Sequence, residues 1–112
     1  MKPTLYHNPR CSKSRQAKAL LQEKGIEFDE ILYLKAELSA EDYLELLNAL
    51  GGQPADHLRK GEAGFKTLTD LDDLAAVARA LSADPILLER PVLRTEQGAW
   101  VCRPPERIHD VL

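Results

Sequence analysis

The segment His7–Arg15, which reads His-Asn-Pro-Arg-Cys-Ser-Lys-Ser-Arg, places one thiol among several cations. Cys11 follows a short β-compatible stretch, Pro3 to His7, and precedes apolar residues at helical spacing. Asn8-Pro9 favours a turn between these two elements. We therefore expect Cys11 at or just before a helix N-terminus, where free backbone N–H groups and the helix dipole favour thiolate over thiol.

The charges around Cys11 strengthen this expectation. Arg10, Lys13 and Arg15 add positive potential near the sulfur, and His7 can add more when it is protonated. The same backbone N–H groups can cradle a tetrahedral oxyanion. One loop could therefore bind an anionic substrate and attack it, with Cys11 as the nucleophile.

Two further residues decide how such a nucleophile would be regenerated. Ser14 stands where a C-x-x-C pair has its second cysteine; its hydroxyl can donate to the thiolate but cannot form a disulfide. An outside thiol is then needed to resolve the intermediate. Cys102 follows Trp100 and Val101 and is expected to be a buried strand thiol, with a resolving role as the alternative.

Three arginines, Arg59, Arg90 and Arg103, stand near the ends of predicted elements. Each offers a bidentate fork that suits a phosphate-like anion better than an ammonium does. Each taken alone is expected to be a surface charge, whereas the three together with the cysteine loop predict one anion site.

The remaining patterns predict the elements that position these residues. The first is a second strand over Phe28–Leu34, covered on both faces. Three helices follow: one capped by Ser39 and Asp42 and stopped at Gly51-Gly52, a short one within 54–60, and one through Leu71–Leu81 capped from Thr69 or Asp70. The chain ends in a hairpin of Pro91–Thr95 and Ala99–Cys102 around Glu96-Gln97-Gly98 and a tail helix after Pro104-Pro105. This order predicts an α/β, thioredoxin-like fold: a mixed sheet built as βαβ and then ββα, with a helical insertion between the halves. The whole chain, 1–112, is expected to form one domain.

Composition excludes several classes of function. Fifteen Lys and Arg against eighteen Asp and Glu give a net charge of -3, so no global basic field predicts binding to nucleic acid or an anionic membrane. No apolar stretch has the length of a membrane span or a signal peptide, which predicts a cytoplasmic protein with reduced thiols. His57 and His109 are expected at the surface, and no Cys/His spacing predicts a metal site.

Several of these segments together resemble the bacterial ArsC family of glutaredoxin-linked arsenate reductases, most closely its short YfgD-like branch. The resemblance lies in Tyr6–Cys11 with Ser14-Arg15, then Ile31–Leu34, Leu58–Lys60, Glu89–Pro91 and Cys102–Glu106, and it spans essentially the whole chain.

The resemblance implies roles for residues already singled out. Cys11 would take the arsenic with His7 and Ser14 supporting its thiolate, while Arg59, Arg90 and Arg103 would hold the arsenate oxygens. It also implies glutathione as co-substrate, glutaredoxin as protein partner and no bound cofactor.

Two alternatives stay open at this stage. One is a redox regulator similar to Spx, which binds RNA polymerase; such proteins usually carry C-x-x-C, and Ser14 speaks against this class. The other is a related thiol oxidoreductase with a different substrate. Phosphate imitates arsenate in shape and charge, but its phosphorus is not reduced by thiols.

Overall fold

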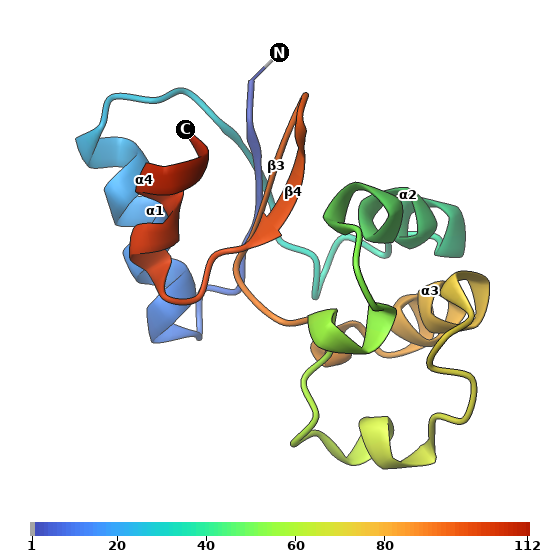
Figure 1. The fold of residues 1–112 in the computed structure, drawn as a ribbon. Coiled ribbons are helices and arrows are strands. Elements are labelled where there is room, and N and C mark those ends of the chain that lie inside the picture. The colour runs from blue at the N-terminus through green and yellow to red at the C-terminus, as the bar shows by residue number, and fades with distance from the viewer. Residues whose placement is uncertain (1) are drawn as a thin grey trace. The chain divides into compact units, whose positions relative to one another are not determined.

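The computed structural model describes residues 2–112, which form two compact units. The first unit contains the N-terminal segment up to Ala36 together with Arg90–Leu112, and the second is Glu37–Glu89 (Figure 1). The chain therefore leaves the first unit once and returns to it, so the second unit is an insertion in sequence. Each unit is described in turn.

The first unit is built on a four-stranded mixed sheet in the order β2-β1-β3-β4. Its strands are β1 (Thr4–Tyr6), β2 (Asp29–Ile31), β3 (Val92–Thr95) and β4 (Gly98–Val101). β1 runs parallel to β2 and antiparallel to β3, and β3 runs antiparallel to β4. Because β1 lies between two neighbours, the residues that follow it emerge from the middle of the sheet.

Helices α1 (Ser12–Glu23) and α4 (Ile108–Val111) lie side by side against this sheet (Figure 1). A 3-10 turn, η4 (Pro105–Arg107), leads into α4. The helices and the strands share one buried core, made of Leu5, Ala17, Leu21, Leu93, Cys102 and Ile108. This core fixes the face of α1 that is turned to the sheet, and with it the place of the residues at the helix N-terminus.

The C-terminus of α1 is set by Gly25, whose φ is +68°. Its N–H donates to Gln22 O, and the next N–H, that of Ile26, reaches back to Leu21 O. This pair of bonds closes the helix because glycine adopts positive φ without steric cost.

Two expectations about the first unit are wrong. β2 is a three-residue edge strand in which Asp29 and Glu30 are exposed, so it is not a long strand covered on both faces. Beyond it the chain turns, with Lys35 and Ala36 N–H both donating to Leu32 O. The hairpin loop is also shorter than expected, because Thr95 pairs with Gly98 and leaves only two residues between β3 and β4.

The second unit packs two helices, α2 (Ala40–Leu50) and α3 (Leu74–Ala83), against each other. The expected capping box is present: Ser39 Oγ accepts from Asp42 N–H, and the Asp42 carboxylate accepts from Ser39 N–H. The 3-10 turns η1 (Pro54–His57), η2 (Ala63–Thr67) and η3 (Pro85–Leu87) complete this unit. The short helix predicted within 54–60 is thus η1.

The start of α3 differs from the prediction. Asp73, not Thr69 or Asp70, is the N-cap, and its carboxylate accepts from Ala75 and Ala76 N–H. Asp70 is used one turn earlier, where its carbonyl accepts from Asp73 N–H. Aspartate is a favourable N-cap residue at either position. Because Asp70 takes part in the preceding turn, the helix begins after Asp73.

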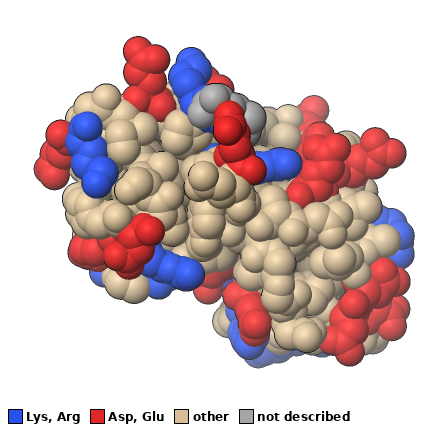
Figure 2. Space-filling model, turned by 45° about the horizontal axis from the view of Figure 1, so that its top comes forward, with Lys and Arg blue, Asp and Glu red and all other residues tan. Residues whose placement is uncertain are grey.

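The observed order of strands and helices is that of the expected α/β, thioredoxin-like fold. Figure 2 shows basic and acidic side chains interspersed on the surface, in keeping with the small net charge of -3. Among the described residues, no helix has the length and apolar character needed to span a bilayer.

Candidate active site

A β-turn at the end of β1 delivers Cys11 to the start of α1. Cys11 N–H donates to Asn8 O at 3.0 Å, and Pro9 occupies the second position of the turn, where its fixed φ is favourable. Asn8 Oδ1 accepts from Arg10 N–H at 3.0 Å. Cys11 is therefore the N-cap of α1 with an extended backbone, which confirms its expected position.

The electrostatic surroundings of Cys11 favour its thiolate. Burial acts to raise the pKa of the Cys11 thiol, but the Ser14 N–H, the positive charge of Arg90 and the Lys13 N–H act in the opposite direction and hold the pKa below its ordinary value of 9.0. The side chain is partly exposed, so a small anion can reach it. These are the properties of a reactive nucleophile.

Arg103 lies beside this sulfur. Its Nη1 is 4.0 Å from Cys11 Sγ and donates to Arg90 O at 3.1 Å. The structure thus brings Cys11, Arg90 and Arg103 together within the first unit, from three segments far apart in sequence. The peptide bonds Arg90-Pro91 and Arg103-Pro104 are both cis.

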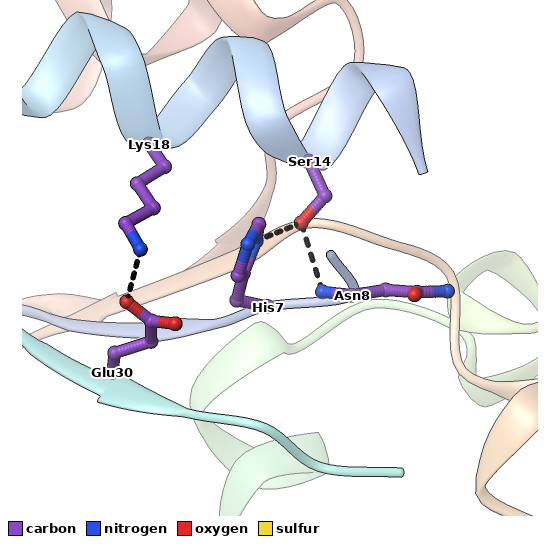
Figure 3. Close-up of polar contacts among 5 residues, drawn as sticks. All are labelled: His7, Asn8, Ser14, Lys18 and Glu30. Carbon is purple, nitrogen blue, oxygen red and sulfur yellow. Dashed lines mark hydrogen bonds and ion pairs between the residues drawn. The ribbon is translucent and has the colours of Figure 1, made fainter. Parts of the chain in front are cut away.

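Ser14 and His7 form a buried polar pair beneath the turn (Figure 3). His7 Nδ1 and Ser14 Oγ are 2.6 Å apart, and Asn8 N–H donates to the same Oγ at 3.0 Å. The sequence allows the Ser14 hydroxyl to donate to the thiolate. In the structure its Oγ contacts His7 and Asn8, and the backbone N–H of Ser14 favours the thiolate.

His7 does not add the positive charge that we expected near Cys11. Its burial lowers the pKa of the imidazole; the charge of Glu30 opposes this, whereas the charges of Lys18 and Arg15 add to it. The imidazole therefore carries less positive charge at pH 7 than an ordinary histidine, and its Nδ1 shares a hydrogen bond with Ser14 Oγ.

Sequence reasoning missed two contributors to this site. Asn8 was expected only as part of a turn, yet its N–H, carbonyl and side chain all hold the loop. Asn before Pro carried that signal, because Asn side chains accept from the backbone two residues on. Lys18 Nζ also pairs with Glu30 Oε2 at 2.9 Å, joining α1 to β2 next to His7 (Figure 3). No sequence spacing indicated this pair.

Arg59 belongs to the second unit. Its backbone N–H donates to Leu87 O, and its guanidinium pairs with Glu62 Oε1 at 3.0 Å. Its part in an anion site stays a prediction.

Cys102 is fully buried in the core of the first unit, as expected, but it lies one residue beyond the end of β4 and not within the strand. Burial raises the pKa of its thiol to about 11. Its Sγ lies 3.7 Å from Trp100 O. This thiol is thus far less reactive at neutral pH than that of Cys11.

The two other histidines each have a polar partner. His57 contacts Gly51 O through Nε2, and the exposed His109 contacts Lys24 Nζ. Within residues 2–112, no three or more His, Cys, Asp or Glu side chains gather in a way that could hold a metal ion.

A thioredoxin-like sheet that carries one activated N-cap thiol with two arginines beside it defines the class of this protein by its fold and its site. The sequence model of the ArsC family matches residues 6–111, and the chain belongs to this family.

Relatives agree with this assignment. The chain is 38% identical to the Escherichia coli K12 protein YfgD, described as uncharacterized, over 96% of this chain and 94% of YfgD. It is 37% identical to an arsenate reductase of Neisseria meningitidis serogroup A, over 96% of both chains. The structure of an arsenate reductase from Vibrio cholerae superimposes with a TM-score of 0.88 at 33% identity, covering 100% of this chain and 98% of the other.

Proposed function

We propose that this protein is a cytoplasmic arsenate reductase that uses glutathione and glutaredoxin. The observation that supports this most directly is the thiol of Cys11, activated at a helix N-terminus and lying 4.0 Å from Arg103 Nη1. Family relatives named arsenate reductases point to the same chemistry.

The proposed reaction begins when the Cys11 thiolate attacks arsenic(V). A sulfur–arsenic bond forms and one arsenic–oxygen bond breaks, and the departing hydroxyl takes a proton from solvent and leaves as water. Arg90, Arg103 and Arg59 neutralise the remaining oxygens. Glutathione then displaces a second hydroxyl, again as water. Arsenic is still pentavalent at this stage.

Reduction occurs when a glutaredoxin thiolate attacks the glutathione sulfur. A mixed disulfide forms, and the electron pair of the broken sulfur–arsenic bond stays on arsenic, which becomes trivalent. The two thiols thereby supply the two electrons that the reduction needs. Water finally releases arsenite from Cys11 and restores the thiol.

A redox regulator that switches through C-x-x-C fits the site less well. Ser14 cannot form a disulfide, and its hydroxyl is buried against His7 and Asn8. Arg103, placed beside the single thiol, is instead suited to an anionic substrate.

The test is arsenate-dependent NADPH oxidation in a mixture of glutathione, glutathione reductase and glutaredoxin. The wild-type protein should accelerate it, Cys11→Ser should reduce the rate to that of the mixture alone, and the matched variant Cys102→Ser should keep most of the activity. Equal rates for wild type and Cys11→Ser would show that Cys11 does not carry arsenate reduction.

A further inference from the structure

A cavity of about 290 Å³ lies against the turn that delivers Cys11, and no step of the proposed reaction assigns it a ligand. One side is formed by His7–Arg10, and the other by Leu32, Leu34 and Lys35, which follow β2. All of these residues belong to the first unit. Its volume is close to the lower limit of about 300 Å³ for small-molecule sites, which suits a compact ligand.

The walls of this cavity combine three kinds of chemistry. Arg10 and Lys35 are exposed cations that come from two different segments. Leu32 and Leu34 supply apolar surface, and Leu34 is 39% exposed. A ligand that fits carries separated negative charges on a short, partly apolar frame.

His7 adds a buried polar group to the same cavity. It is 3% exposed, it lines the cavity, and its Nδ1 is occupied by Ser14. An imidazole ring can donate or accept a hydrogen bond, depending on which of its nitrogens carries the proton. A buried polar ring favours a ligand with polar groups over a purely apolar one.

We propose that this cavity binds glutathione, with Arg10 and Lys35 each holding one of its two carboxylates. This inference rests on the proposed function, in which glutathione is the co-substrate. Arg10 directly precedes Cys11 in the chain. A tripeptide held there keeps its thiol close to arsenic bound on Cys11, which replaces a bimolecular encounter by a local one. Arsenate could pair with Arg10 and Lys35, but it would make no contact with the apolar surface of Leu32 and Leu34.

The binding test uses S-methylglutathione, which cannot react, and amide chemical shifts of the full chain without arsenate. Shifts should concentrate at Arg10, Leu32, Leu34 and Lys35 and should weaken as salt is added. Lys35→Gln should raise the dissociation constant about two- to fivefold, the effect of one partly exposed charge pair. Lys66→Gln removes an exposed charge from the second unit and should change nothing.

Inorganic phosphate, titrated in parallel, distinguishes a general anion site. The proposal is overturned if phosphate causes the same chemical-shift changes as S-methylglutathione, or if the changes with S-methylglutathione lie outside these residues. Equal dissociation constants for S-methylglutathione in Lys35→Gln and Lys66→Gln would also overturn it.

Kinetics then separate this inference from the proposed function. If both hold, Lys35→Gln raises the KM for glutathione and leaves the KM for arsenate unchanged. Arsenate reduction with an unchanged glutathione KM in Lys35→Gln contradicts the cavity assignment alone. If S-methylglutathione binds at these residues but the protein reduces no arsenate, the glutathione site is supported and arsenate as substrate is contradicted.

Discussion

His7 Nδ1 and Ser14 Oγ lie 2.6 Å apart, and this contact joins the end of β1 to the first turn of α1. Asn8 N–H donates to the same oxygen, and all three residues are buried. One hydroxyl therefore satisfies two buried polar groups directly beneath the reactive cysteine. The residue that replaces the second cysteine of C-x-x-C is consequently a structural part of the loop.

Ser14→Ala should destabilise the protein, because it leaves Asn8 N–H and His7 Nδ1 without their buried partner. We expect the free energy of unfolding, measured in urea, to fall by about 1–3 kcal/mol. Ser12→Ala, an exposed change in the same turn of α1, is the matched control and should cost much less. Equal losses in the two variants would contradict the structural role of the Ser14 hydroxyl.

The position of Cys11 could be predicted from sequence because its determinants are local. A short strand, an Asn-Pro turn and the apolar spacing of α1 all lie within a few residues of it, and together they make it the N-cap. The capping box of α2 was predictable for the same reason, since Ser39 and Asp42 are three residues apart.

Features set by contacts between distant segments could not be predicted this way. The apolar run after Phe28 suggested a long buried strand, but sheet order makes β2 an edge, and a turn at Leu32 ends it. Arg103 approaches Cys11 across 92 positions of sequence, because the sheet brings together the segments that follow β1 and β4. In the sequence, only the position of Arg103 near the end of a predicted element indicated a role at the site.

The two cysteines should differ sharply in their labelling by iodoacetamide. Only the thiolate reacts, so a lowered pKa raises the reactive fraction at pH 7 and a raised pKa reduces it. The pKa of Cys11 is below 9.0 and that of Cys102 is about 11, so the thiolate fractions differ by at least about a hundredfold. Peptide mass mapping should find Cys11 modified first; prior modification of Cys102 would contradict the site.

Arg90→Gln should raise the pKa of Cys11, because it removes a positive charge that favours the thiolate. The midpoint of the labelling rate against pH is expected to move up by about half a unit to one unit. Arg94→Gln, a change further along the same segment in β3, is the control and should leave the midpoint in place. Equal midpoints in wild type and Arg90→Gln would exclude this electrostatic role.

We predict that Arg59, Arg90 and Arg103 hold one anion, and lysine should then be a poor substitute at each of them. Each replacement keeps the charge but loses the bidentate fork, so the KM for arsenate should rise severalfold, by about fivefold or more. Arg79→Lys, in α3, is the control. Crystals soaked in arsenate should show the anion near Cys11 with at least two of these guanidinium groups; an anion bound elsewhere, with the three pointing into solvent, would refute the site.

Electron supply should depend on thiols from outside the chain. Ser14 cannot close a disulfide, and Cys102 is fully buried with its pKa raised to about 11, so an intermediate on Cys11 lacks a reactive internal thiol. Turnover should therefore need glutathione together with glutaredoxin, and thioredoxin alone should support little of it. Cys102→Ser, which keeps the size of the side chain, should retain this dependence. If thioredoxin alone sustains full turnover and mass analysis finds a Cys11–Cys102 disulfide after one cycle, Cys102 is the resolving residue and must become exposed during the reaction.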